Sequence, residues 1–154
     1  RGRGHEHFSD ELLKIFDWTS RRTRSTFPKE IDAVSMRPWD RLFWWIEMDS
    51  PPQRTMVIPN DWPPTQFGRP FALSAKATAS NKITARCGAE EVRIWLSPEI
   101  VDFQRPLTIN LGTRRIHQGD ITPDIDTLLE DLRRRCDYQH PFWAVVTNKP
   151  KSAQ

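Results

Sequence analysis

Apolar residues recur with the spacing of a helix in two segments of the chain, residues 8–24 and 123–136. Elsewhere they alternate with polar residues, as in half-buried strands, over short segments: 31–36, 82–87, 92–96, 107–111 and 114–117. A weaker alternation at 71–75 and an apolar run at 142–146 predict two further strands. The pattern therefore predicts a mainly β chain with one helix near each end.

The order and spacing of the strands favour a β-sandwich. Successive strands lie about ten residues apart, as in sandwich domains. Gly112-Thr113 separates two of the strands and predicts a hairpin. Residues 42–48 are apolar on both faces as far as Glu47, which predicts one central strand. The proline-rich segment 50–70 predicts a loop with at most a short strand at 56–58.

The first predicted helix carries signals at both ends. Ser9 is the candidate N-cap, and Asp10 and Glu11 suit the positive end of the helix dipole. Arginines crowd the other end, and Pro28 stops helical structure. We therefore expect an amphipathic helix whose apolar face needs a covering surface.

The second helix shows the clearer pattern. Thr122 is its candidate cap, and Pro123 occupies the first helical position. Glu130–Arg134 and Asp131–Arg135 are favourable pairs four residues apart. One apolar stripe runs along the helix: Ile121, Ile125, Leu128, Leu129, Leu132 and Cys136. We expect this helix to pack across the sandwich.

Composition and charge narrow the classes of function. Lys and Arg outnumber Asp and Glu by 23 to 20, which is not the balance of a nucleic-acid binder. Arginine groups at 21–24 and 133–135 fall at helix C-termini, where the helix dipole accounts for them. Nucleic-acid binding through them stays a third alternative, with steep salt dependence as its signature. Residues 42–46 form the longest apolar run, which predicts no membrane span.

The sequence leaves open the cellular compartment of the protein and the redox state of its two cysteines. The chain shows no signal peptide, and it begins with Arg1 instead of Met, which predicts a partial chain whose targeting signal could lie upstream. Cys87 and Cys136 could form one bridge or remain two buried thiols.

Histidines before the first helix are the sharpest chemical feature. In Gly4-His5-Glu6-His7-Phe8, His5 lies between a glycine-bearing turn and a helix N-terminus, where an imidazole can act as general base. Such a base needs a serine nucleophile and a carboxylate, and this chain contains no G-x-S-x-G. The alternative is that His5 and His7 are ordinary exposed residues. His5-x-His7 lacks further spaced ligands, so we expect no metal and no cofactor.

The aromatic run Phe43-Trp44-Trp45 allows two interpretations. With Trp39, Trp62 and Trp95 it could form a platform that stacks sugars or bases. The same residues lie within strand patterns, where Trp is a large hydrophobic filler, and core packing is therefore favoured.

Several longer phrases carry a family resemblance. They are Arg3-Gly4-His5-Glu6-His7-Phe8, Phe27-Pro28-Lys29-Glu30, Met36-Arg37-Pro38-Trp39-Asp40, Trp95–Phe103, Leu128-Leu129-Glu130-Asp131 and Gln139–Ala144. Together they resemble the C-terminal portion of the planctomycete α/β-hydrolases, the prolyl-oligopeptidase-like or carboxylesterase-like serine hydrolases. The resemblance covers nearly the whole chain.

The resemblance implies that His5 is the base of a Ser–His–Asp triad in a longer protein that hydrolyses an ester or peptide. The nucleophile, the acidic residue and the oxyanion donors would lie upstream of Arg1, so the chain alone would be inactive. Residues 1–25 would be the tail of the catalytic domain, 27–148 an appended antiparallel immunoglobulin-like sandwich of accessory or structural role, and 149–154 a frayed tail.

The implied partners are the upstream catalytic domain and a second copy of the chain through helix 8–24, with no nucleic acid and no membrane span. The implied location is secreted, periplasmic or cell-surface. The alternative function is a free-standing β-sandwich module that binds carbohydrate or protein.

Overall fold

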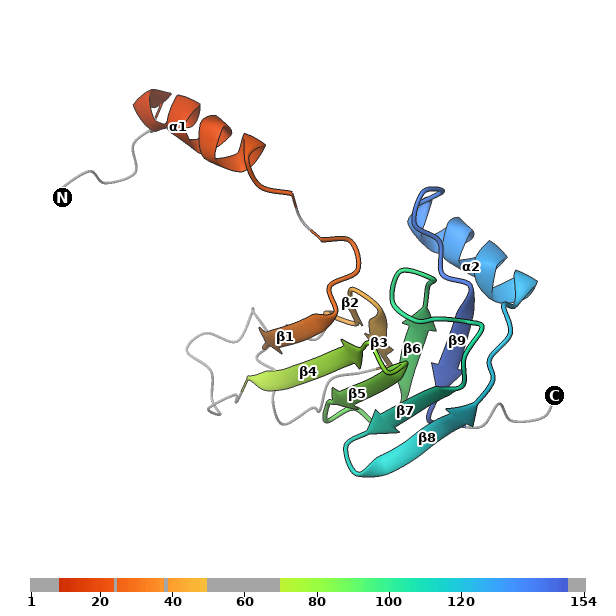
Figure 1. Ribbon diagram of the computed structural model, residues 1–154. Coiled ribbons are helices and arrows are strands. Elements are labelled where there is room, and N and C mark those ends of the chain that lie inside the picture. Colours follow the sequence, from red (N-terminus) through yellow and green to blue (C-terminus); the bar gives the residue numbers. More distant parts are fainter. Residues whose placement is uncertain (1–8, 24, 38, 50–69, 150–154) are drawn as a thin grey trace.

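The computed structural model describes residues 9–23, 25–37, 39–49 and 70–149 (Figure 1). Within these ranges the chain is mainly β. In order, the elements are α1 (Ser9–Ser20), β1 (Glu30–Ser35), β2 (Leu42–Phe43), β3 (Ile46–Met48), β4 (Phe71–Thr78), β5 (Lys82–Arg86), β6 (Val92–Leu96), β7 (Leu107–Leu111), β8 (Arg114–Gly119), α2 (Ile125–Arg135) and β9 (Ala144–Thr147). The predicted short strand at 56–58 lies outside these ranges, and so does the predicted frayed tail 149–154 apart from Lys149.

The strands form two open sheets in a sandwich-like arrangement (Figure 1). One sheet has five strands in the order β1-β4-β5-β7-β8, and the other has four in the order β2-β3-β6-β9. The expectation of a mainly β sandwich with helices is confirmed at this level. The expectation that every strand pair is antiparallel is wrong, because β5 and β7 run parallel. The reason is that β6, between them in the chain, belongs to the other sheet.

Buried residues of both sheets form one hydrophobic core. Along β4, buried and more exposed residues alternate, and Phe71, Leu73, Ala75 and Ala77 are buried. This alternation follows from the strand geometry, which sends successive side chains to opposite faces. The hairpin predicted at Gly112-Thr113 joins β7 and β8, and Gly112 has the positive φ of 60° that such turns favour.

Residues 42–48 do not form the single strand that their apolar pattern predicts. They form a tight hairpin in which Leu42 pairs with Glu47 and Phe43 with Ile46, so that Trp44 and Trp45 make the turn. The sequence signal failed because neither turn position carries the Gly, Asn or Asp that favours such turns.

α2 packs on the outer face of the four-stranded sheet. The side of the helix that faces the sheet is not the predicted apolar stripe. Its buried residues are Thr127 and Asp131, whereas Ile125 and Leu129 of the predicted apolar stripe are 64% and 56% exposed. Its N-cap is Asp124, whose side chain accepts hydrogen bonds from the backbone N–H groups of Asp126 and Thr127, and not the predicted Thr122. Polar contacts therefore fix this helix, as described below.

α1 lies apart from the sheets (Figure 1). It ends at Ser20, earlier than its pattern predicts, and it contains no buried residue. Its exposed apolar side chains are Leu12, Leu13, Ile15, Phe16 and Trp18. The described part of the chain thus leaves the apolar face of α1 uncovered.

Candidate functional site

The histidine that sequence reasoning singled out, His5, lies outside the described residues, as do His7 and Trp62. Another histidine, His140, is described: its Nδ1 lies 2.7 Å from Glu99 Oε1. This is the pairing that orients a catalytic histidine. No hydroxyl contacts the His140 ring among the described residues, so the pair by itself carries no nucleophilic chemistry.

Four of the phrases that carry the family resemblance contact one another in pairs. Lys29 Nζ donates to the backbone carbonyls of Glu99 and Ile100, at 2.6 Å and 2.9 Å. The N–H of Phe142 donates to Asp131 Oδ2 at 2.9 Å. These contacts join phrases far apart in the sequence, and their role is structural. The phrase at 36–40 differs, because its described side chains lie at the surface or beside an open pocket.

The aromatic run divides between core and surface. Trp45 and Trp95 are buried, as the core interpretation requires, whereas Trp44 is 38% and Trp39 is 57% exposed. Phe43 is half-buried and packs edge-on against Phe71, with 5.7 Å between ring centroids. The run is therefore neither wholly part of the core nor wholly an exposed stacking platform.

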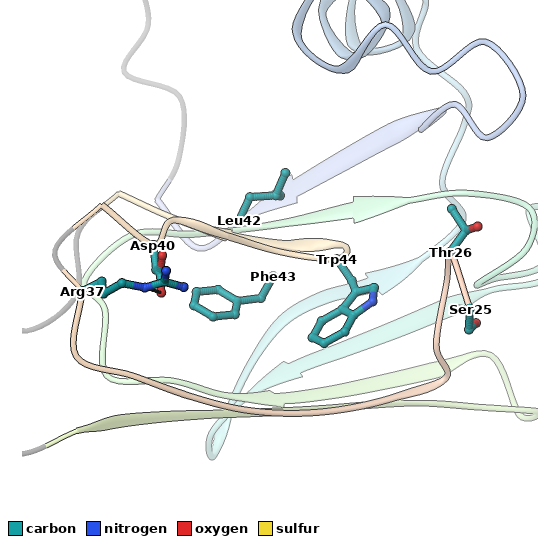
Figure 2. A pocket seen from close by; sticks show the side chains of 7 residues that line it. All are labelled: Ser25, Thr26, Arg37, Asp40, Leu42, Phe43 and Trp44. Atoms are coloured by element: carbon teal, nitrogen blue, oxygen red, sulfur yellow. Dashed lines mark hydrogen bonds and ion pairs between the residues drawn. The ribbon is translucent and has the colours of Figure 1, made fainter. Parts of the chain in front are cut away.

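An open pocket of about 520 Å³ lies beside this run (Figure 2). We call it the hairpin pocket. In Figure 2, Arg37 and Asp40 lie at one end, Ser25 and Thr26 lie at the other, and the rings of Phe43 and Trp44 lie between them. Leu42 completes the lining. The pocket thus combines aromatic faces with a charged pair, the mixture expected of a small-molecule site.

The hairpin turn presents Trp44 to this pocket. Trp44 has φ 54°, in the left-handed region that bulky residues rarely enter. Its neighbour Trp45 is fully buried, and the Trp45 indole N–H donates to the carbonyl of Pro28 at 2.9 Å. The carbonyl of Trp45 accepts the N–H of Trp95 at 2.9 Å. These bonds anchor the turn and leave Trp44 at the surface.

Ser35, at the end of β1, contacts both members of the charged pair of the pocket, Arg37 and Asp40. Arg37 Nε donates to Asp40 Oδ2 at 3.0 Å, and the Ser35 hydroxyl donates to the same carboxylate oxygen. Ser35 is buried at the end of β1, and its Oγ also accepts the backbone N–H of Arg37 at 3.1 Å. The Asp40 side chain is only 16% exposed. The Asp40 carboxylate is therefore held in place before any ligand arrives, and the more exposed Arg37 side chain bonds to it.

Sequence reasoning found the parts of this pocket but not the pocket. It recognised residues 37–40 as a turn and residues 43–45 as an aromatic run. What it missed is the reversal at Trp44, which brings the two segments together. The signal was present in Glu47, the one charged residue in the apolar segment 42–48, because a charge there argues against a single central strand.

A second cluster of charges joins α2 to the sheet. Glu47 is buried, and Arg134 donates to both of its oxygens, at 2.7 Å and 3.0 Å. The indole N–H of Trp95 adds a bond of 2.8 Å. Burial alone would raise the pKa of Glu47, but these bonds, with the charges of Arg134 and Arg93, outweigh burial and lower it. These bonds hold α2 against the sheet, and the role of the cluster is therefore structural.

The arginine group at 133–135 is likewise engaged within the protein. Arg133 bonds to Glu130, and Arg135 bonds to Asp131. Its charges are therefore compensated, and this gives no support to nucleic-acid binding. Of the two predicted pairs, Asp131–Arg135 is confirmed, whereas Arg134 pairs with Glu47 instead of Glu130.

Three further observations concern the described residues only. Cys87 is partly buried, Cys136 is exposed and both are free thiols, and burial raises the pKa of Cys87. No three His, Cys, Asp or Glu side chains gather there as a metal site. Neither helix combines the length and the hydropathy that crossing a membrane requires.

Comparison of the chain with protein-family models, with curated proteins and with solved structures finds no match. The fold and the hairpin pocket therefore stand on the geometry alone.

Proposed function

We propose that this chain is the C-terminal portion of a serine hydrolase of the α/β-hydrolase class, which cleaves an ester or peptide bond. Residues 1–25 then belong to the catalytic domain, and α1 is its last helix. Residues 27–148 form the appended immunoglobulin-like domain, with an accessory or structural role. The proposal rests on the family resemblance, and one structural observation supports it.

That observation is the uncovered apolar face of α1. Leu13, Phe16 and Trp18 are 80%, 63% and 57% exposed, although helices of globular proteins normally bury such a face. A helix of 12 residues is too short to be stable in water by itself. A further protein surface against α1 would supply the missing burial, as the main body of a hydrolase domain would.

In the proposed mechanism His5 acts first as base and then as acid. Its imidazole removes the proton from the serine hydroxyl as that oxygen attacks the scissile carbonyl. The same nitrogen then delivers the proton to the leaving group, which departs from the tetrahedral intermediate and leaves an acyl-enzyme. His5 next activates the water that releases the acid product. The nucleophile, the acidic residue and the oxyanion donors belong to the preceding domain, so this chain alone is expected to be inactive.

The test uses two neighbouring histidines as a matched pair. His5→Ala and His7→Ala are made in the product of the full reading frame, including whatever coding sequence precedes Arg1. Hydrolysis of p-nitrophenyl esters and of peptide p-nitroanilides is then measured. His5→Ala should lower kcat by roughly 10⁶-fold, as removal of a triad histidine does, while His7→Ala retains turnover. Equal activity of the two variants would refute the proposal, as would a reading frame without a serine nucleophile.

A second function, a module that binds carbohydrate or protein, is supported by a different observation. The hairpin pocket exposes Trp44 beside a fixed Arg37–Asp40 pair. This function needs no upstream triad, and it is compatible with an accessory role in a hydrolase. Binding that survives His5→Ala would separate it from catalysis.

A further inference from the structure

We infer that the hairpin pocket binds an uncharged saccharide, with the Trp44 indole as the stacking surface and the Arg37–Asp40 pair as the hydrogen-bonding group. The inference rests on the second proposed function, the binding module, and gives that module its ligand class. It is independent of His5.

The charge of the pocket selects an uncharged ligand. Arg37 and Asp40 are the two charged residues of the lining, and they form an ion pair of 3.0 Å. The other lining residues are Ser25, Thr26, Leu42, Phe43 and Trp44. A site for an anion would leave a cation uncompensated, and a site for a cation would leave a carboxylate uncompensated. This pocket does neither.

The pair still has hydrogen bonds to give. Arg37 uses Nε on Asp40, so within the described part of the chain its two terminal amino groups have no partner. Asp40 receives Ser35 and Arg37 on Oδ2, and its Oδ1 accepts from no described residue. Donors of Arg37 therefore lie beside an acceptor of Asp40. Neighbouring sugar hydroxyls match this arrangement, because each hydroxyl can accept from the guanidinium and donate to the carboxylate.

The backbone at Trp44 indicates that the exposed indole has a use. The left-handed conformation is strained for a residue with a side chain, and glycine would occupy this turn position without that strain. Strain of this kind is concentrated at ligand sites. The indole lies over the pocket between Phe43 and the Ser25–Thr26 segment (Figure 2). The flat face of the Trp44 indole can stack on the C–H face of a sugar ring, while Arg37 and Asp40 bind the sugar hydroxyls.

Size and shape agree with this ligand. The pocket volume of about 520 Å³ falls within the usual range of small-molecule sites, roughly 300–1,000 Å³. Phe43 forms part of its floor, because it is fixed edge-on against the buried Phe71. A rigid floor and a fixed polar pair reduce the ordering cost of binding a flexible, hydrated ligand.

The experiment is native electrophoresis of the full 154-residue chain through gels that contain one polysaccharide each. The neutral probes are β-glucan, galactomannan and xylan, the anionic probe is polygalacturonate, the peptide probe is gelatin, and a plain gel is the reference. At least one neutral gel should retard the chain. Trp44→Ala should weaken that retardation at least tenfold, Trp44→Phe should restore part of it, and Arg37→Ala should weaken it.

Trp39→Ala is the matched control, because Trp39 is a more exposed tryptophan of the same segment that does not line the pocket. It should bind as the parent chain does, and His5→Ala should as well. Retardation by polygalacturonate or gelatin alone would overturn the ligand class and leave the binding module standing. No retardation in any gel would overturn both. Equal loss in Trp44→Ala and Trp39→Ala, with both variants folded by near-ultraviolet circular dichroism, would overturn the placement of the site.

Discussion

Arg134 of α2 and Glu47 of β3, 87 positions apart in the chain, form a two-pronged ion pair across the outer face of the four-stranded sheet. The pair buries the Glu47 carboxylate beneath the helix, where Trp95 and Arg93 also contact it. A carboxylate in such a place is stable only while its partners remain. Together with the bond from the Phe142 N–H to Asp131, this contact sets the position of α2, although the helix offers an apolar stripe on another side.

Arg134→Met should destabilise the domain by about 2 kcal/mol. The change keeps most of the aliphatic chain but leaves Glu47 buried with fewer partners, a loss reduced here because Arg134 is itself partly exposed. Urea unfolding followed by circular dichroism measures it. Arg133→Met is the control, because within the described ranges Arg133 pairs with the partly exposed Glu130 alone. The stability of this variant should match that of the parent. Equal losses of stability in the two variants would contradict a stabilising role of the Arg134–Glu47 ion pair.

Acid should weaken the ion pair between Glu47 and Arg134. The pKa of Glu47 is lowered in the folded state, so its contribution to stability is complete above the ordinary glutamate pKa of about 4.3. The contribution is lost as the pH falls below that value and the carboxylate takes up a proton. Glu47→Gln should therefore be less stable than the parent at pH 7, and the difference should shrink at pH 3. Asp137 and Glu130, whose pKa values are also lowered, are present in both proteins and cancel. A difference that does not change with pH would refute the prediction.

Substitutions at Trp44 should reverse the usual order of alanine and glycine. Both changes remove the indole, but only glycine adopts φ 54° without strain, so Trp44→Gly should be more stable than Trp44→Ala by about 1 kcal/mol. Thermal or urea unfolding gives the comparison. Trp39 lacks a positive φ, and there alanine should be the more stable replacement. If alanine is better at both positions, the turn at Trp44 does not have this conformation.

The start of α2 can be tested with one pair of variants. Asp124→Ala should cost about 1 kcal/mol, because its carboxylate caps the N–H groups of Asp126 and Thr127. Thr122→Ala should leave stability unchanged, although the sequence signals favour Thr122 as the cap. The free energy of unfolding and the helical content at 222 nm decide between them, and a larger loss for Thr122→Ala would restore the assignment from sequence.

The sequence predicts strands well where local alternation decides them. Val92–Leu96 and the pair of strands around Gly112-Thr113 follow the pattern. In the first, Val92, Ile94 and Leu96 are fully buried, although Trp95 on the other face is buried as well; the pair turns at a glycine. Prediction from sequence fails where contacts with residues distant along the chain determine which side chains are buried. Asp131 is buried only because the Phe142 N–H and Arg135 satisfy its carboxylate, and neither bond is visible in helical periodicity. The hairpin pocket is missed for the same reason, since the turn at Trp44 depends on bonds from Trp45 to Pro28 and Trp95.

The parallel pairing of β5 with β7 makes the domain a single folding unit. The chain leaves the five-stranded sheet after β5, crosses to the four-stranded sheet as β6, and returns as β7. The formation of the two sheets is therefore coupled through the chain that joins β5, β6 and β7. Separate halves, cut in the loop between β5 and β6, should remain unfolded when produced alone. Because these pairings join distant segments, we expect slow and concerted folding, on the order of milliseconds to seconds.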